Sequence, residues 1–411
     1  MKIKKIGAYA VLDSRKEKTI CVSIKTPRGK FVTFAPTGKS TGKYEAKSYA
    51  SSLEGDIDFI NGLNIGNINK ILERRGVVKN SEQAFNFLGA VEKLVNGKIG
   101  GNSLFALEAS LLKALAYENG KELWEFLRDR KKRIVAFPRP VGNAIGGGLH
   151  SVGRGGKKPD FQEFLFIADG KTFRESVKIN NLAYKLSGKL LGYWIKKRND
   201  EGGFGTNLSN EEVLELMMNV KKIIKKEYNY NVDIGIDVAA SSFYKNSHYV
   251  YKNPHSRLDK NAQLNYISGL IKKYNLFYVE DGLEENDFNG FGELLKKAGR
   301  GCLIVGDDLT ATNPSRLMKA IKLHSINAII VKPNQIGSLI SVKKVIEIAH
   351  SAGIKTIISH RSGETLDNTI ADLAIGFGCD FIKTGIYGNV RRVKLKRVMN
   401  IENFFKKFSK T

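Results

Sequence analysis

Six apolar segments in the second half of the chain each end on an ionisable side chain. These end residues are Asp237, Glu280, Asp307, Lys332, His360 and Lys383. In a barrel of parallel strands, the carboxyl ends of the strands form one face, and active sites are built there. A single charge after a strand often only begins a solvated loop. Six in succession, with acids before bases, predict one chemical site.

The three acids of this set predict a divalent metal. Converging carboxylates repel one another unless a cation lies among them, and their oxygens are hard ligands. Asp237, Glu280 and Asp307 therefore predict Mg²⁺; Mn²⁺ would satisfy the same oxygens, whereas zinc prefers histidine or cysteine. Because successive side chains of a strand point in opposite directions, we expect the adjacent Asp281 and Asp308 to support the site without binding metal.

The two lysines predict a base. A lysine is protonated at neutral pH unless a neighbouring cation lowers its pKa. We expect Lys332 and Lys383 to face each other near the metal, so that the pKa of the base is lowered. A lysine base beside magnesium suits removal of a proton next to a carboxylate, because the metal neutralises the charge that develops.

The elements that must position these residues fall into two parts. Residues 19–26 and 30–37 alternate apolar and polar side chains around a Pro-Arg-Gly turn, which predicts a hairpin, and residues 104–120 have helical spacing. From about residue 135, short apolar strands alternate with helices, which is typical of a parallel sheet, either doubly wound or closed as a barrel. A Gly-x-Gly-x-x-Gly motif after the first strand is absent, which weakens the dinucleotide-binding alternative.

The composition is that of a globular protein with a large excess of positive charge. The 411 residues are 42% hydrophobic, and the net charge is +26. The basic residues are spread along the chain, which favours a lysine-rich surface over a nucleic-acid site. No apolar run approaches the ~18 residues of a membrane span, and the N-terminal apolar segment is too short for a signal peptide, so we expect a cytoplasmic protein. Cys21, Cys302 and Cys379 lie far apart, and we expect them to be reduced and mostly buried.

Nine short motifs occur in the order found in one enzyme family. They are DSR at 13–15, TGKSTGKYEA at 37–46, QEF at 162–164, NDEGG at 199–203, EDG at 280–282, GDDLTATNP at 306–314, VKPNQIGSL at 331–339, SHRSGET at 359–365 and IKTG at 382–385. In this ordered set the chain resembles the enolases, the phosphopyruvate hydratases of glycolysis, from about residue 5 to residue 402.

The resemblance implies a fold and a reaction. The fold is α/β: a (β/α)8-type barrel of the enolase superfamily over residues 135–411, preceded by a smaller α+β capping domain over residues 1–134. The reaction is the reversible dehydration of 2-phosphoglycerate to phosphoenolpyruvate, with two Mg²⁺ expected per active site.

Roles for single residues also follow from the resemblance. Lys332 is implied as the base that takes the C2 proton, and Glu201 as the acid that protonates the departing hydroxyl. The three strand-end acids would hold the first magnesium, and Ser40 would bind the second. The implied substrate contacts are Gln162, Glu163, the loop residue His150 and the carboxylate-binding Lys383.

The segment SHRSGET is expected to bind phosphate. Arg361 is a planar fork that, together with Ser362, suits a phosphate group, and His360 lies at the same rim. We do not expect a nucleophilic serine–histidine pair here, because Ser362 and His360 are two residues apart and no acid is placed to orient the histidine.

Several positions depart from the family pattern. The interval between His150 and Glu163 is longer than usual and adds Arg154, Lys157 and Lys158 to a loop expected to act as a lid, so turnover or substrate preference could differ. Cys21 stands where the family commonly has a glutamate at its dimer interface. We therefore expect a homodimer, or a higher oligomer, with an altered interface.

Two alternatives stay open. One is a paralogue that acts on another phosphorylated hydroxy acid, which the altered lid motivates. The other is a basic binding protein that contacts nucleic acid or another polyanion. A protein that only binds has no use for proton-transfer lysines. The second alternative therefore requires that catalytic residues of the family be missing, and the sequence shows no such loss.

Overall fold

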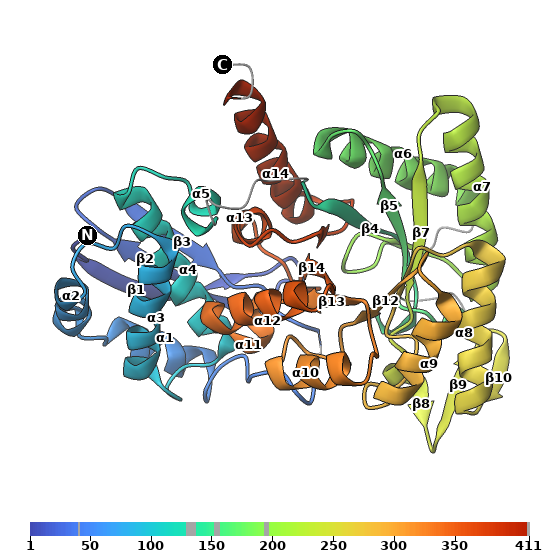
Figure 1. The fold of residues 1–411 in the computed structure, drawn as a ribbon, viewed down its shortest axis with the longest axis horizontal. Helices are drawn as coiled ribbons and strands as arrows, with labels where there is room; N and C mark the ends of the chain where they lie inside the picture. The colour runs from blue at the N-terminus through green and yellow to red at the C-terminus, as the bar shows by residue number, and fades with distance from the viewer. Residues whose placement is uncertain (40–41, 129–136, 152–156, 193–196, 409–411) are drawn as a thin grey trace.

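The computed structural model describes residues 1–39, 42–128, 137–151, 157–192 and 197–408 and arranges them in two lobes (Figure 1). The smaller lobe contains an antiparallel sheet of β1 (Lys5–Leu12), β2 (Lys18–Lys25) and β3 (Lys30–Phe34), in that order. Its helices are α1 (Leu53–Asn61), α2 (Ile65–Arg74), α3 (Ser81–Val95), α4 (Gly101–Glu118) and α5 (Leu123–Leu127). The predicted hairpin is β2–β3, and the predicted helix is α4, which packs on these two strands.

Within the described residues, the larger lobe is a closed barrel of eight strands. They are β4 (Arg139–Gly146), β5 (Glu163–Ala168), β7 (Val232–Asp237), β11 (Tyr278–Glu280), β12 (Leu303–Gly306), β13 (Ala328–Val331), β14 (Lys355–Ser359) and β15 (Phe381–Lys383). Pairing of β15 with β4 closes the ring, and the short β6 (Phe204–Gly205) adds to β4 outside it. The barrel and the small capping lobe confirm the predicted fold class.

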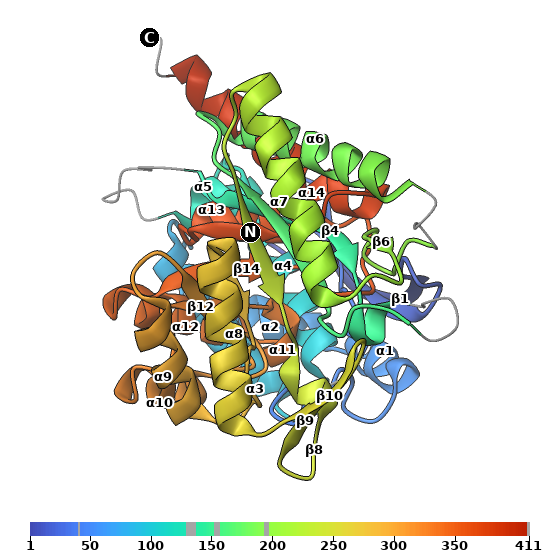
Figure 2. The ribbon, with the colours of Figure 1, turned by 90° about the vertical axis from the view of Figure 1, so that its right-hand side faces the viewer.

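Helices follow most of the barrel strands and lie on its outer side, as α7, α8 and α9 do in Figure 2. They are α6 (Phe173–Leu191), α7 (Asn210–Tyr228), α8 (Lys260–Tyr274), α9 (Phe288–Ala298), α10 (Pro314–Lys322), α11 (Pro333–Ile336), α12 (Leu339–Ser351), α13 (Thr369–Gly376) and α14 (Asn389–Phe408). A small sheet of β8 (Tyr244–Lys245), β9 (His248–Lys252) and β10 (His255–Leu258) follows β7.

The barrel interior is a packed core. Side chains from seven strands of the ring form one buried cluster: Val141, Leu165, Ile167, Tyr278, Val305, Ala328, Ile330, Ile357 and Phe381. Because these strands surround the barrel axis, the cluster fills the middle of the barrel and leaves the strand ends as the place for chemistry.

Two strands differ from simple strand–helix alternation. β4 has the sequence RPVGNAIG, whose proline and glycines hide it from a search for apolar runs. β5 runs antiparallel to both β4 and β7, so the first residue of β5, Glu163, pairs with the last residue of β7, Asp237. This reversal brings Glu163 to the same face as the carboxyl ends of the other strands.

The two lobes meet at the segment that follows β14. Thr37 and Gly363 exchange backbone hydrogen bonds, from Thr37 N to Gly363 O at 2.7 Å and from Gly363 N to Thr37 O at 2.9 Å. A Cβ atom at position 363 would lie 2.0 Å from Asp13 Oδ2 and 2.1 Å from Thr37 Oγ1, so only glycine allows this approach.

The predicted domain boundary at 134/135 falls in a range outside the described residues and stays a prediction. Among the helices described, none is long and apolar enough to cross a membrane.

Candidate active site

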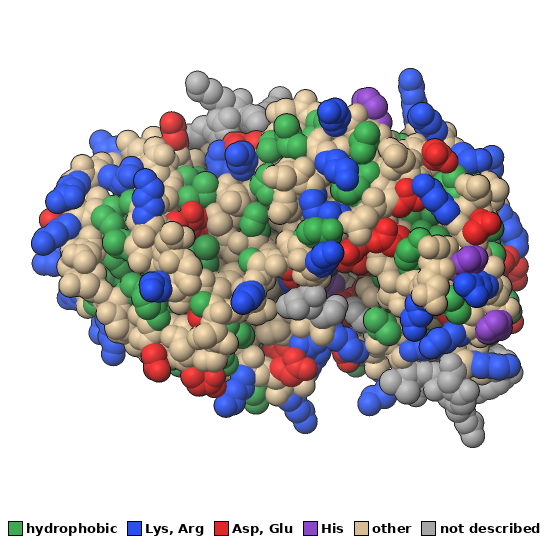
Figure 3. Space-filling model, turned by 90° about the horizontal axis from the view of Figure 1, so that it is seen from below, with side chains coloured by type: hydrophobic (Ala, Val, Ile, Leu, Met, Phe, Trp, Pro, Cys, Tyr) green, Lys and Arg blue, Asp and Glu red, His purple; other side chains and the backbone are tan. Residues whose placement is uncertain are grey.

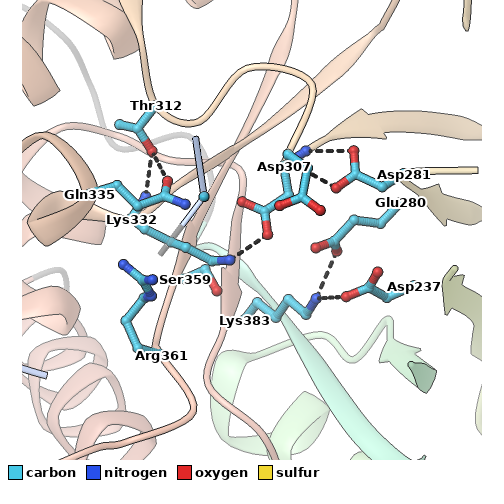
Figure 4. Close-up of polar contacts among 12 residues, drawn as sticks. Asp237, Glu280, Asp281, Asp307, Thr312, Lys332, Gln335, Ser359, Arg361 and Lys383 are labelled. Carbon is cyan, nitrogen blue, oxygen red and sulfur yellow. Dashed lines mark hydrogen bonds and ion pairs between the residues drawn. The ribbon is translucent and has the colours of Figure 1, made fainter. Parts of the chain in front are cut away.

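Figure 4 shows five of the strand-end residues close together: Asp237, Glu280, Asp307, Lys332 and Lys383. Lys383 Nζ lies 2.7 Å from Glu280 Oε2, 3.1 Å from Asp237 Oδ2 and 3.0 Å from Glu163 Oε2. All four residues are buried. One ammonium group thus joins carboxylates from three other strands.

A second ion pair lies beside this cluster. Lys332, which follows β13, pairs with Asp307, which follows the neighbouring strand β12. The backbone N–H of Lys332 donates to Thr312 Oγ1 at 3.0 Å, and the Thr312 hydroxyl donates to Gln335 Oε1 at 2.7 Å. These bonds fix the base of the Lys332 side chain at the strand end.

Besides Glu163 Oε2, which lies 3.0 Å from the Lys383 ammonium, two buried carboxylate oxygens in this cluster have no hydrogen-bond donor among the described residues: Glu280 Oε1 and Asp307 Oδ1. Each of these carboxylates uses its second oxygen, since Glu280 Oε2 accepts from Tyr278 at 2.5 Å and Asp307 Oδ2 accepts from Lys332. Oxygens left without donors in a buried site suit a hard cation. The chemistry of this donor set therefore fits Mg²⁺.

The most compact group of acids in the described part of the chain is Asp281, Asp307 and Asp308. Asp281 is engaged there by the backbone, because its Oδ1 accepts from Asp307 N at 3.1 Å and its Oδ2 from Asp308 N at 2.7 Å. It thereby fixes the turn after β12 and orients Asp307. This arrangement supports Asp281 as a residue that holds a metal ligand in place.

Burial and mutual repulsion hold protons on several of these acids. Burial raises the pKa of Asp237 to about 7, with the Glu163 charge adding to the rise and Lys383 opposing it. Burial and then the Asp237 charge raise the pKa of Glu280 well above its usual range. Although burial opposes it, the charge of Lys332 holds the pKa of Asp307 below its usual value. The site therefore carries protons that a bound cation would displace.

The expectation that Lys383 acts as the neighbouring cation that lowers the pKa of Lys332 is wrong for this structure. Burial alone would lower the pKa of Lys332, but the carboxylate of Asp307 outweighs it and raises that pKa. The pKa of Lys383 is likewise raised well above its usual range by Asp237, Glu163 and Glu280, against the effect of burial. The lysines face carboxylates here and not each other, so neutralisation of those carboxylates is what would free a lysine to act as a base.

Glu201 lies in the segment before β6. The side chain of Asn199 shapes this turn, because its Oδ1 accepts from Glu201 N at 3.1 Å and from Gly203 N at 2.8 Å. Glu201 Oε2 accepts from Asn143 Nδ2 on β4 at 3.4 Å and lies 3.6 Å from His360 Nε2. An acid therefore does lie beside His360, although none was expected; it comes from a distant segment, which local sequence does not reveal.

Glu163 interacts with both Glu201 and Lys383: it feels the negative charge of Glu201 and forms an ion pair with Lys383. Burial raises the pKa of Glu163 to about 7, and the negative charge of Glu201 adds to this rise. Glu163 therefore changes its protonation state near neutral pH, and the nearby charge of Glu201 favours its protonated form.

The SHRSGET segment is held by polar contacts from both lobes. Arg361 Nη2 pairs with Glu45 Oε2 at 2.9 Å, and Arg361 Nη1 donates to Asn334 Oδ1 at 3.3 Å. Ser362 Oγ accepts from Arg15 Nη1 at 3.3 Å. Sequence reasoning assigned no role to Arg15 or Glu45, although both lie in quoted motifs, DSR and TGKSTGKYEA.

Some predicted residues cannot be placed in this geometry. Ser40 and Arg154 lie outside the described residues, and only the backbone of His150 is described, in the short 3-10 helix η1 (Gly148–His150). Gln162 is half-buried, and its backbone N–H donates to Asp237 O at 2.9 Å. In the basic loop, Lys158 Nζ donates to Ser151 O at 2.7 Å.

The positive charge is distributed over the surface. Figure 3 views the molecule from the side of these strand ends and shows Lys and Arg side chains scattered over both lobes, with Asp and Glu side chains between them. Among the described residues, this face has no continuous basic block of the kind that suits nucleic acid. All three cysteines are unpaired and buried, as expected.

Comparisons with known proteins agree with this geometry. Residues 134–410 match the family model for the enolase C-terminal TIM barrel domain. The chain is 37% identical to the Enolase of Thermoplasma acidophilum over 415 aligned residues, covering 97% of this chain and 98% of that protein. Similar matches are the Enolase of Picrophilus torridus, 35% identical over 97% and 98% of the two chains, and that of Methanocorpusculum labreanum, 37% identical over 98% and 99%.

Proposed function

The chain belongs to the enolase family, and on that premise we propose how its residues divide the work of interconverting 2-phosphoglycerate and phosphoenolpyruvate. It is a hydro-lyase, a phosphopyruvate hydratase. The main support for these assignments is the placement of Lys332, the proposed base, and Glu201, the proposed acid. Lys332 follows β13 and Glu201 lies beside β4, with β14 and β15 between them in the ring. A base and an acid on opposite sides suit removal of a proton and a hydroxyl from neighbouring carbons.

Lys332 is the proposed base. Its ammonium group must lose a proton to act, and its partner Asp307 opposes that loss. Asp237, Glu280 and Asp307 are proposed to hold Mg²⁺, which would neutralise these carboxylates and stabilise the doubly charged ene-diolate of the substrate. Ser40 is the proposed protein ligand of a second Mg²⁺. The two buried oxygens without donors, Glu280 Oε1 and Asp307 Oδ1, support the first assignment.

Glu201 is the proposed acid. Its carboxyl group gives a proton to the departing hydroxyl, so that the C3–O bond breaks and water leaves. The neighbouring Glu163, with a pKa of about 7, can hold a proton next to Glu201 between turnovers. Lys383, held by Glu163 and Glu280, is proposed to bind the substrate carboxylate.

The phosphate end of the substrate is proposed to lie at Arg361 and Ser362, with His360 at its rim. Burial of Arg361, a residue that is only 6% exposed, supports this role, because a guanidinium kept out of water binds a phosphate strongly. Gln162 and His150 complete the proposed substrate contacts from the segments on either side of the basic loop.

An oligomer and a cytoplasmic location complete the proposal. Tyr9 and Leu12 of β1 are 43% and 64% exposed, and such apolar side chains on a sheet of the smaller lobe support a contact with a second copy. The three buried, unpaired cysteines support a reducing compartment.

Activity of the purified protein tests the reaction directly. With Mg²⁺ and 2-phosphoglycerate we expect phosphoenolpyruvate to form, followed by its ultraviolet absorbance, and we expect chelation of the metal to stop the reaction. Correct folding, checked by circular dichroism, with no product would contradict the assigned reaction. Turnover of another phosphorylated hydroxy acid in its place would favour the paralogue alternative.

Magnesium binding is expected to strengthen with pH. The pKa of Asp237 is raised to about 7, so near pH 6 the folded protein holds a proton there that Mg²⁺ must displace. The apparent Kd should therefore fall about tenfold for each such carboxyl between pH 6 and pH 8, because the ionised fraction rises by about that factor. Isothermal titration calorimetry in two buffers of different ionisation enthalpy measures both the Kd and the protons released.

Thermal unfolding supplies an independent test with a matched control. A folded-state pKa above the unfolded value near ~4 means that this carboxyl's contribution to the free energy of unfolding falls as pH rises towards 7. Mg²⁺ binds the ionised carboxylate and offsets this fall in the free energy of unfolding. The rise in Tm that Mg²⁺ causes should therefore be larger at pH 8 than at pH 6. Asp237→Asn should abolish that difference, whereas Asp233→Asn, on the same strand but paired with Arg139, should keep it. An equal effect of Mg²⁺ at both pH values would contradict the assignment.

A further inference from the structure

Arg391, in the first turn of α14, is one of the most deeply buried large side chains that the structure describes, with 1% of its surface exposed. Its guanidinium donates to four acceptors. These are His360 Nδ1 at 2.5 Å, Arg361 O at 2.7 Å, Ser362 O at 2.7 Å and Asp200 O at 3.2 Å. Each of these contacts joins Arg391 to a segment that carries a proposed catalytic or phosphate-binding residue.

The contact with His360 fixes the position of the imidazole proton. A guanidinium group has donors and no acceptor, so His360 Nδ1 must accept, and the proton of the neutral ring lies on Nε2. This Nε2 is the nitrogen that lies 3.6 Å from Glu201 Oε2. Burial, and then the charge of Arg391, hold the pKa of His360 well below its usual value, so the ring stays neutral. His360 therefore presents a single N–H towards the proposed acid.

The remaining contacts fix the backbone on both sides of that histidine. Arg391 holds the carbonyls of Arg361 and Ser362, whose side chains are proposed to bind phosphate, and the carbonyl of Asp200, which directly precedes Glu201. The packing around it is close, because a Cβ at Gly385 would lie 3.3 Å from Glu201 O, 3.5 Å from Arg391 Cγ and 3.5 Å from His360 Cε1. Gly385 itself has φ +72, a conformation that favours glycine.

We propose that Arg391 is a positioning residue that couples the acid to the phosphate end of the site: it holds His360 as the Nε2–H tautomer facing Glu201 and aligns the backbone of both segments. The proposal rests on the assignment of Glu201 as the acid. When Glu201 has given its proton to the departing hydroxyl, its new carboxylate faces an N–H donor, and a small movement closes 3.6 Å to a hydrogen bond. The neutral N–H of His360 thereby stabilises the charge that forms on Glu201, and the histidine itself does not change its protonation state.

Nuclear magnetic resonance of the histidine ring nitrogens tests the tautomer. In protein labelled with ¹⁵N in histidine, the His360 signals are identified by their loss in His360→Gln. We expect one protonated nitrogen, Nε2, and no change in the ring's charge between pH 6 and pH 8. A proton on Nδ1, or a doubly protonated ring at pH 7, in the wild-type protein would overturn the proposal, and this measurement does not depend on enzymatic activity.

Kinetics of Arg391→Met, with Arg397→Met as its matched control, test the positioning. Arg397 lies on the same helix but pairs with Asp372 and Glu122, away from the site. We expect Arg391→Met to lower kcat by about 10²-fold, as a misplaced catalytic group does, with a smaller rise in KM. Added guanidinium at tens of millimolar should restore part of that loss and should not affect Arg397→Met.

The variants also separate this proposal from a purely structural role. If Arg391→Met does not fold, Arg391→Lys keeps the charge but cannot reach four acceptors, and it should lose kcat while retaining a Tm close to that of Arg397→Lys. Full activity of a folded Arg391→Met or Arg391→Lys would overturn the positioning role. A wild-type protein without activity would instead refute the proposed function, with the tautomer still decided by the resonance experiment.

Discussion

Lys332→Ala is expected to lower kcat by about 10³-fold to 10⁴-fold, at the upper end of the range for loss of a general base, while KM changes little. Lys383, the other lysine at these strand ends, cannot replace it, since Lys383 is held by three carboxylates. Steady-state production of phosphoenolpyruvate measures the loss. Exchange of the C2 proton of 2-phosphoglycerate with deuterated solvent isolates the step that Lys332 performs, and this exchange should disappear as well.

The control for this substitution is His248→Ala. His248 lies on β9 and contacts Asn246 O and Arg257 outside the site, so its loss should leave kcat and proton exchange unchanged. The folded state of Lys332→Ala should persist, because the variant removes an ion pair and leaves the Thr312–Gln335 bond intact. Normal exchange in a folded Lys332→Ala would refute the base assignment.

The strand ends were the part of the site most open to prediction from sequence. A short apolar run followed by an ionisable residue is a local pattern, and the closed ring of strands converts it into a spatial cluster. Asp237, Glu280 and Lys383 illustrate this, because each is the last residue of its strand. The barrel class followed from the same local alternation.

Contacts between distant segments were not open to such prediction. Arg361 and Glu45 are 316 residues apart, and only the docking of the two lobes brings them to 2.9 Å. The antiparallel course of β5 also has no local signal, since its apolar run has the same character as those of its parallel neighbours. The error about the lysine pKa values has the same origin. Acids and bases keep their sequence order around the ring, but Lys332 pairs with Asp307 of the neighbouring strand and Lys383 reaches across the barrel to acids of other strands, so each lysine has a carboxylate partner.

Arg391 shows a further limit of reasoning from a motif. Its segment, NVRRVK at 389–394, belongs to none of the nine motifs that carry the family resemblance. The structure turns this arginine inward, to His360 and three backbone carbonyls. An exposed arginine and a buried one have the same letter in the sequence, and only the fold shows which acceptors are left for it to satisfy.

Glu201→Gln is expected to block loss of the hydroxyl but not removal of the C2 proton, whereas Lys332→Ala should block both steps. An amide cannot donate the proton that the departing hydroxyl needs, so formation of phosphoenolpyruvate should fall by about 10³-fold. Lys332 is untouched, and the C2 proton should still exchange with solvent at a rate close to that of the wild-type protein. Loss of exchange together with loss of product would mean that Glu201 acts on the base or on substrate binding and is not the acid.

The same substitution should change the charge state of Glu163. The negative charge of Glu201 contributes to the raised pKa of Glu163, and burial is the larger cause. Because the amide removes only the charge, the pKa of Glu163 should fall below its value of about 7 but stay above that of an exposed glutamate. Carboxyl ¹³C resonances of labelled protein measure this shift. Asp200→Asn, which removes the neighbouring surface ion pair with Lys39, is the matched control and should leave both the pKa of Glu163 and kcat unchanged, since that pair is partly exposed and screened by solvent.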